Sequence, residues 1–348
     1  MSRKKKPEIP TLGRQKILLI RLRRIGDIIM TTPAISALKK AFPQASMTYI
    51  VEEPYRRLVE GNPNLDRVIA IDKKQHLRDF LRLLRLIRNE DYDVVIDFHG
   101  GPRAWWLTLL SGADFKVGYK VKYRGFAYNI AQPRGSKNGF IHSVENHLNL
   151  IRALGVDPKS PPSLDLPQAQ ESERLRIDEF FKDNRLEGAK VIALHIGAGN
   201  EFRDWGTAHW ADLADRLARM PQVKVVLIGA EADRPAEEEI RARCRVPLLS
   251  LVGKVNLIEL KEMLSRASLF VGPDSGPMHI AASASTPVVA LFGPTLPDHF
   301  SPWMANAQIV SKELSCRPCR QKRCEFSDFR CLRTIQTEEV YGACLRFL

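Results

Sequence analysis

The sequence predicts an α/β protein made of two doubly wound domains. Short apolar runs typical of buried parallel strands alternate with helical segments, and 348 residues are more than one hydrophobic core usually holds. A proline-rich stretch, residues 155–167, interrupts this alternation near the middle of the chain. We therefore expect an N-terminal domain of residues 1–165 and a C-terminal domain of residues 166–348, with a ligand cleft between them.

The expected elements follow the same rhythm in both halves. In the first half we expect strands at Lys16–Ile20, Ser46–Val51, Arg67–Ile71 and Tyr92–Phe98, and helices from Asp27 to about Phe42, at Pro54–Glu60 and at His76–Asn89. In the second half we expect strands at Lys190–His195, Val223–Ile228, Leu248–Leu251, Leu269–Val271 and Val288–Phe292, and helices at Glu171–Asn184, Ala208–Ala218, Pro235–Arg243, Leu257–Arg266 and Ile280–Ser285. Ligands of such folds lie beyond the carboxyl ends of the strands.

The positive charge of the chain is confined to its first half. Residues 1–165 hold 29 Lys and Arg against 16 Asp and Glu, whereas residues 166–348 hold 24 of each. Such a field attracts polyanions, which include nucleic acid, anionic lipid and phosphorylated glycolipid. The simplest alternative is a solvated basic surface that keeps the protein in solution.

The N-terminus gives no sign of export. Residues 1–10 carry four basic side chains, but no apolar segment follows them, and no stretch approaches the roughly 20 apolar residues of a membrane-spanning helix. We therefore expect a cytoplasmic protein whose cysteines are reduced thiols or metal ligands.

The first candidate loop, residues 21–33, joins the first strand to the first helix. It lacks the G-x-G-x-x-G pattern, so NAD binding is not indicated. Asp27 lies at or just before the helix start, where it is either a helix N-cap or a functional carboxylate. Three neighbouring arginines favour the second role, because they would keep the carboxylate ionised and attract an anionic acceptor.

Two loops of the second half have the composition of a phosphate site. Residues 272–279 follow a strand and precede a helix, so backbone N–H groups and Ser275 can face a diphosphate. Residues 195–205 also follow a strand, with Gly197 at the strand end and Arg203 placed to reach a phosphate. The alternatives are an ordinary turn with a buried histidine and a loop with an exposed arginine.

Two further segments carry distinctive patterns. Residues 77–88 predict a basic amphipathic helix, which either lies on anionic lipid or covers its own sheet with its charges in water. Four cysteines with the spacing C-x2-C-x4-C-x6-C predict either a structural zinc or iron site or free, redox-active thiols; they are Cys316, Cys319, Cys324 and Cys331.

Taken together, Arg23–Ala34, Gly272–Ala282 and Val289–Thr295 resemble the motifs of glycosyltransferase family 9, the ADP-heptose:lipopolysaccharide heptosyltransferases. The resemblance extends from about Lys16 to Tyr341, with the motifs in the family's order. It implies a GT-B fold of two Rossmann-like domains, with the acceptor on the N-terminal domain and the ADP-sugar on the C-terminal one. It also implies inverting, metal-independent transfer of heptose from ADP-L-glycero-D-manno-heptose to the inner core of lipopolysaccharide.

The same resemblance implies roles for individual residues. Asp27 becomes the catalytic base. The donor contacts become Gly197, Arg203, Glu231, Asp274, Ser275, Gly276 and His279, and the acceptor contacts become Arg24, Arg103 and Arg124. Many members have lysine where this chain has Arg203, and arginine keeps the charge while adding bidentate phosphate contact. For Glu231, a solvated loop position is the alternative to a ribose or adenine contact.

The implied partners are ADP-heptose, a Kdo-lipid A or heptosylated core acceptor, and the anionic inner face of the inner membrane, where the protein would be peripheral. One alternative keeps the fold and changes the nucleotide sugar or uses a protein acceptor. A basic nucleic-acid-binding protein is disfavoured because no recognised motif of that class is present. A non-catalytic scaffold is disfavoured because Asp27 and the donor loop are both present.

Overall fold

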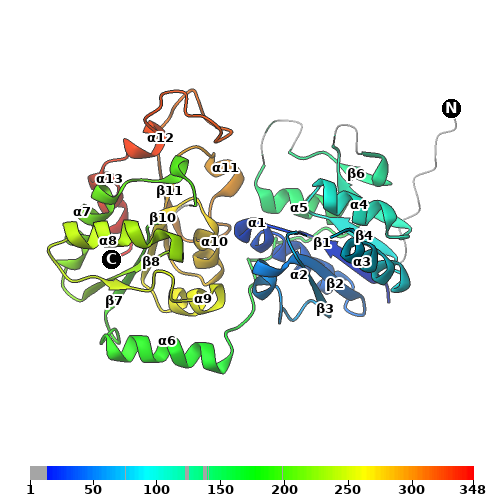
Figure 1. The fold of residues 1–348 in the computed structure, drawn as a ribbon, viewed down its shortest axis with the longest axis horizontal. Helices are drawn as coiled ribbons and strands as arrows, with labels where there is room; N and C mark the ends of the chain where they lie inside the picture. The colour runs from blue at the N-terminus through cyan, green and yellow to red at the C-terminus, as the bar shows by residue number, and fades with distance from the viewer. Residues whose placement is uncertain (1–13, 75, 122–124, 136–138, 140, 198) are drawn as a thin grey trace. The chain divides into compact units, whose positions relative to one another are not determined.

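The protein consists of two compact units, Met1–Pro167 and Gln168–Leu348, each built around one six-stranded parallel sheet (Figure 1). The structure, a computed structural model, describes residues 14–348 except 75, 122–124, 136–138, 140 and 198. The predicted α/β class with two doubly wound sheets is confirmed.

The sheet of the first unit has the strand order β3-β2-β1-β4-β5-β6. Its elements are β1 (Lys16–Ile20), α1 (Ile25–Ile29), α2 (Thr32–Ala41), β2 (Ser46–Glu52), the 3-10 helix η1 (Glu53–Leu58), β3 (Arg67–Ile71), α3 (Leu77–Asn89), β4 (Val94–Asp97), α4 (Pro102–Leu110), β5 (Phe115–Tyr119), η2 (Gly125–Ala127), β6 (Ile130–Gln132) and α5 (Ser143–Arg152). The strand order reverses between β1 and β4, the two central strands.

Helices cover both faces of this sheet because its central strands are apolar on both sides. In β1, Ile17–Ile20 are fully buried. Leu18 and Ile20 pack in one cluster with Leu84 of α3 and Leu107 of α4, so these two helices share a face. The helix α2 lies on the opposite face, since its crossover to β2 runs in the other direction, and it packs against α5.

The second unit repeats this plan with the strand order β12-β11-β10-β7-β8-β9. Its elements are α6 (Glu171–Asp183), β7 (Lys190–His195), η3 (Glu201–Arg203), α7 (Thr207–Ala218), β8 (Val223–Ile228), η4 (Glu231–Asp233), α8 (Arg234–Arg243), β9 (Leu249–Ser250), α9 (Leu257–Ser265), β10 (Leu269–Pro273), α10 (Gly276–Ser283), β11 (Val288–Phe292), α11 (Pro297–Phe300), β12 (Ala307–Ser311), α12 (Arg330–Arg333) and α13 (Thr337–Cys344). The strand order reverses between β10 and β7.

A buried tryptophan ties the end of the chain to the second sheet. Trp205 is fully buried, stacks on His209 with 5.1 Å between the ring centroids, and donates a hydrogen bond from Nε1 to the Ile335 carbonyl at 2.9 Å. The segment that follows β12 therefore packs on the core of this unit.

Most predicted strands and helices are present, and the differences have local causes. The segment predicted as one helix up to Phe42 is two helices. The first, α1, ends at Ile29, and the second, α2, begins at Thr32 with Pro33 in its first turn, a position that favours proline. The predicted α-helix at Pro54–Glu60 is the 3-10 helix η1. The helix predicted at Ile280–Ser285 begins four residues earlier, at Gly276.

The described helices are too short, or insufficiently apolar, to cross a membrane. The longest among them, α3 and α6, have 13 residues each.

Candidate active site

Both sheets bring their chemically distinctive loops to the place where the strand order reverses. In the first unit the loops after β1 and β4 are neighbours, and in the second unit the loops after β10 and β7 are neighbours. Doubly wound folds bind ligands at this position, beyond the carboxyl ends of the strands. The loop residues singled out from the sequence therefore lie at the two ligand-binding edges that the topology favours.

In the first unit, Asp27 lies beside a buried arginine. The Arg21 guanidinium forms an ion pair with Asp27 Oδ2 at 2.6 Å and donates a hydrogen bond to the Phe98 carbonyl, beyond β4, at 2.7 Å. The second carboxylate oxygen of Asp27 has no hydrogen-bond partner among the described residues, and 29% of the side chain is exposed. Arg21 thus fixes the orientation of a carboxylate whose other oxygen is open to a ligand.

The N-cap interpretation of Asp27 is wrong. Arg24 is the N-cap residue of α1, and Asp27 is the third residue of that helix, with Oδ2 3.5 Å from the Arg24 backbone nitrogen. A carboxylate in the first helical turn is still favoured by the helix dipole. The Arg24 side chain is exposed, so its predicted contact with the acceptor stays a prediction.

A buried carboxylate organises the neighbouring loop after β4. Asp97 accepts hydrogen bonds from the backbone nitrogens of His99 and Gly100, both at 2.8 Å, and from the Tyr128 hydroxyl at 2.7 Å. Burial raises the pKa of Asp97. This network holds the turn that presents the Phe98 carbonyl to Arg21, so Asp97 and Tyr128 support the Asp27 site from outside it.

His99 is a neutral group at the same edge. Burial, followed by the charges of Arg21 and Arg23, lowers its pKa to about 4. At neutral pH the imidazole therefore adds a polar group, and no further positive charge, to the surroundings of Asp27.

Of the other two predicted acceptor contacts, Arg103 and Arg124, the structure describes the first. Arg103 forms an ion pair with the buried Glu52 at 2.6 Å and donates to the Asp72 and Lys73 carbonyls at 3.1 and 2.9 Å. Its guanidinium thus links three segments of the first unit, and its contact with an acceptor stays a prediction. Arg124 lies outside the described residues.

In the second unit, Arg203 and Asp274 join the two central loops. The Arg203 guanidinium donates to the Asp274 carbonyl at 2.6 Å and lies 3.8 Å from its carboxylate. Thr295, in the loop after β11, donates its hydroxyl hydrogen to Asp274 Oδ2 at 2.5 Å. Asp274 is buried and is therefore an internal anchor that holds Arg203 at the sheet edge.

The start of α10 offers donors at the same edge. Ser275 is its N-cap residue, and the Ser275 hydroxyl is buried with no hydrogen-bond partner in the described part of the chain. Gly276 is the first helical residue, so the unsatisfied N–H groups of the first turn begin there. An unpartnered hydroxyl beside free backbone donors is the arrangement that a phosphate group would satisfy. His279, on the same turn, is buried.

Gly197 and Glu231 lie on loops after β7 and β8. A Cβ atom at Gly197 would collide with the Asp233 carboxylate, so any larger residue here would have to displace that side chain. Glu231 is 68% exposed and forms an ion pair with Arg234, which lowers the pKa of Glu231. Its role as a ribose or adenine contact stays a prediction.

His195 ends β7 beneath this site and makes the stability of the fold depend on pH. It is buried, its Nδ1 donates to the Ile228 carbonyl at 3.3 Å, and burial lowers its pKa to about 4. The unfolded chain binds the proton with a pKa near 6.5, so the stability present above that pH is lost as the pH falls toward about 4. We expect the free energy of unfolding to fall by about 3 kcal/mol through this window on account of His195.

Urea unfolding at pH 7, 6, 5 and 4.5 measures this loss. His195→Gln should make the loss between pH 6.5 and 4 smaller, with the remainder due in part to the partly buried His99, whereas the same change at the exposed His76 should leave the loss unchanged. Parallel profiles for the wild type and His195→Gln would contradict the assignment.

The four cysteines surround one cavity. Cys316, Cys319, Cys324 and Cys331 line a space of about 180 Å³. Burial raises the pKa of Cys331 to about 11. Among the described residues, however, no three Cys, His, Asp or Glu side chains are grouped so as to hold a metal ion. The shared cavity is a finding, and its occupation by zinc or iron stays a prediction.

A glutamine connects this cysteine segment to the donor loop. The Gln321 side-chain oxygen accepts hydrogen bonds from Arg203 Nε and Asn200 Nδ2, both at 3.2 Å, and its backbone nitrogen donates to Cys319 Sγ at 3.3 Å. Sequence reasoning missed this residue because nothing in its neighbourhood marks a contact with a loop more than 100 positions away.

Comparison with known proteins assigns the chain to a family. Residues 80–329, more than half of the chain, match the family described as Glycosyltransferase family 9 (heptosyltransferase). The chain belongs to glycosyltransferase family 9. The predicted resemblance is thereby confirmed. This family 9 chain is 27% identical over 300 residues to the lipopolysaccharide core heptosyltransferase OpsX of Haemophilus influenzae, covering 85% of the chain and 84% of OpsX.

Solved structures resemble the family 9 chain over almost its full length. A family 9 glycosyltransferase from Veillonella parvula superposes with a TM-score of 0.87 at 25% identity, covering 98% of this chain and 99% of that one. The E. coli heptosyltransferase WaaC with ADP superposes with a TM-score of 0.71 at 18% identity, covering 96% and 100%. The likeness to WaaC concerns the fold, and the predicted GT-B architecture is confirmed.

Proposed function

We propose that the protein transfers heptose from ADP-L-glycero-D-manno-heptose to an inner-core lipopolysaccharide acceptor, with inversion at the anomeric carbon. The observation that carries the proposal is the Asp27 carboxylate, held by Arg21 at the ligand-binding edge of the first sheet with one oxygen open. Family membership and the relative OpsX, a lipopolysaccharide core heptosyltransferase, support the donor sugar and the acceptor class.

Asp27 acts as the general base in this proposal. Its open oxygen takes the proton from an acceptor hydroxyl as that hydroxyl oxygen attacks the anomeric carbon, and the bond from that carbon to the diphosphate breaks. The Arg21 ion pair holds the carboxylate in one orientation. The exposed Arg24 is the proposed contact for an anionic group of the acceptor, with Arg103 and Arg124 as the other two proposed contacts.

The second unit binds the ADP part of the donor and still holds ADP when it departs as the leaving group. The unpartnered Ser275 hydroxyl, the N–H groups at the start of α10 and the Arg203 guanidinium face the same edge and would stabilise negative charge on the departing diphosphate. Gly276 and Gly197 keep the backbone accessible there, and Glu231 and His279 are the proposed contacts for the nucleoside. WaaC, which has a similar fold, has been solved with ADP.

Catalysis in this proposal needs no metal ion, because Arg203 and the α10 N-terminus supply the positive charge. We expect turnover to be unchanged by EDTA and by added Mg²⁺.

The cysteine quartet is proposed to hold a structural zinc or iron ion, which elemental analysis would detect at about one atom per chain. A Cys319→Ser, Cys324→Ser double variant should lose that atom. Strict dependence of turnover on Mg²⁺ would contradict metal-independent catalysis. Metal-free purified protein would contradict a structural metal at the four cysteines.

We propose that the protein works at the anionic inner face of the inner membrane, because its acceptor is lipid-linked. The uneven charge supports this, since the whole positive excess lies in residues 1–165.

The test is release of ADP from ADP-heptose in the presence and absence of a Kdo-containing lipid A acceptor. Acceptor-dependent release supports the proposal. Turnover with a UDP-sugar in place of ADP-heptose would assign a different donor, and transfer to a protein acceptor alone would assign a different acceptor.

A further inference from the structure

The helix α3 presents cations and apolar side chains on one exposed face. Its buried side consists of Leu83, Leu84 and Ile87, which pack on the sheet. The opposite side exposes Arg78, Arg82, Arg85 and Arg88, together with Leu77 at 72% and Leu81 at 45% exposure. Within the described residues, Arg82 has the single ion pair of the four, with Asp79 at 3.8 Å. The other three arginines form no ion pair with any residue that the structure describes.

A pair of exposed aromatic rings lies on neighbouring elements. Trp106 of α4 is 47% exposed and Phe126 of η2 is 71% exposed. Both rings pack edge-on against the buried Trp105, with centroid distances of 4.7 and 5.2 Å. Trp105 therefore holds two large apolar rings in fixed positions facing solvent. Exposing adjacent apolar rings to water is unfavourable, and such patches mark interaction surfaces.

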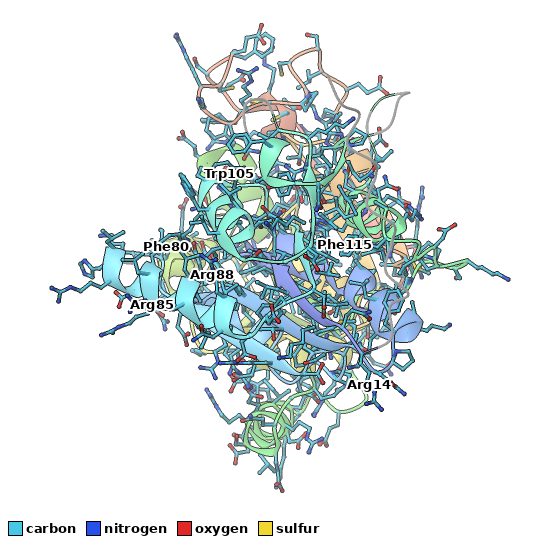
Figure 2. All side chains as sticks on the ribbon, turned by 90° about the vertical axis from the view of Figure 1, so that its right-hand side faces the viewer. Arg14, Phe80, Arg85, Arg88, Trp105 and Phe115 are labelled. Carbon is cyan, nitrogen blue, oxygen red and sulfur yellow. The ribbon has the colours of Figure 1, made fainter. Side chains whose placement is uncertain are left out.

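These elements belong to one side of the first unit. The helices α3 and α4 pack on the same apolar cluster and lie side by side (Figure 2), where Phe80, Arg85 and Arg88 of α3 and Trp105 of α4 are labelled. The loops that begin at Asp72 and Phe98 leave the carboxyl ends of β3 and β4, the edge that also holds Asp27. Leu77, the first residue of α3, therefore lies toward the edge where the acceptor is proposed to bind.

We propose that the exposed sides of α3, α4 and η2 form a docking surface for an anionic lipid bilayer. The four arginines meet anionic headgroups, and Leu77, Leu81, Trp106 and Phe126 enter the headgroup boundary, where tryptophan is favoured. Aliphatic leucines among the arginines favour lipid over a polynucleotide, which offers no apolar counterpart to them. The proposal rests on the proposed function only in that a lipid-linked acceptor gives the bilayer a reason to be there.

Co-sedimentation of the full-length protein with vesicles tests the surface without donor or acceptor. We expect binding to vesicles of phosphatidylethanolamine with 30% phosphatidylglycerol (about one lipid in three), weakening as salt is raised, and little binding to pure phosphatidylcholine. Removing one arginine near an anionic surface should lower the partition coefficient about fivefold, so Arg82→Gln with Arg85→Gln should lower it about 25-fold. The matched control is Arg241→Gln with Arg243→Gln on α8, which removes the same charge from the second unit and should leave binding nearly unchanged.

A second readout examines the apolar part. Brominated lipids should quench part of the tryptophan fluorescence of the wild type, and Trp106→Phe should remove that part while leaving the melting temperature unchanged. Equal binding to anionic and neutral vesicles, equal loss in the α8 control, or tighter binding to RNA than to vesicles through the same arginines would overturn the proposal. If the protein transfers heptose to a deacylated acceptor but binds no vesicles, the docking surface is refuted and the proposed function stands. If it binds vesicles but transfers no heptose, the docking surface stands and the proposed function is refuted.

Discussion

Asp27→Asn is expected to lower kcat for heptose transfer by roughly 10²- to 10⁴-fold, the usual contribution of a general base. Asparagine has nearly the same shape as aspartate but cannot accept the proton of the attacking hydroxyl. Because Asp27 lies in the first unit, the affinity for ADP, which the second unit is proposed to bind, should stay within about twofold of the wild type. Acceptor-dependent ADP release at saturating donor and acceptor measures the first quantity, and isothermal titration calorimetry with ADP measures the second.

Asp212→Asn is a matched control for this variant, because Asp212 is a half-exposed carboxylate that also pairs with an arginine, Arg216, at 3.0 Å. It should leave kcat unchanged. If Asp27→Asn retains more than about a tenth of the wild-type kcat, Asp27 is not the general base. If it loses ADP affinity as well, the variant has disturbed more than the proposed chemistry.

Arg203→Ala is expected to weaken ADP binding by about 10- to 100-fold, because a hydrogen bond to a charged group contributes about 1.5–3 kcal/mol. The Arg203 side chain is mostly buried, and its guanidinium is held between the Asp274 carbonyl and Gln321, so it is preorganised to receive a diphosphate. Arg203→Lys keeps the charge but loses the planar fork, and it should recover part of the affinity. Calorimetry with ADP and the KM for ADP-heptose measure both variants.

The control for these variants is Arg219→Ala, which removes the exposed C-cap arginine of α7, paired with Asp215 at 3.7 Å. ADP binding by this control should equal that of the wild type. An Arg203→Ala protein with normal melting temperature and undiminished ADP affinity would remove Arg203 from the donor site.

The sequence predicted the parts of this architecture that depend on local pattern. The strands β1, β7, β8 and β11 have the predicted bounds, since each is a short run made mostly of buried apolar residues. The helix α4 was not predicted, because its mostly apolar run Trp105–Leu110 is too short to show a clear helical period. Its buried face became evident from the packing on β1 and β4.

The candidate site could be predicted at the level of loops but not of contacts. Asp27 and the loop before α10 stand out in the sequence because strand-to-helix loops of doubly wound folds carry ligands. The partners that hold them do not stand out. Tyr128 reaches Asp97 across 31 positions and Thr295 reaches Asp274 across 21, and such pairs depend on where the chain returns after a crossover.

The hydrogen bonds of Gln321 have a consequence for exchanging parts between members of this family. A chimera that replaces only the cysteine segment also replaces the partner of Arg203 and Asn200, and a chimera that replaces only the loop after β7 leaves Gln321 facing foreign residues. Residues 196–205 and 312–331 therefore form one unit of exchange, although 106 positions of the chain, residues 206–311, separate them. Crossover points for domain grafting belong before β7 and after α12, where neither loop loses its counterpart.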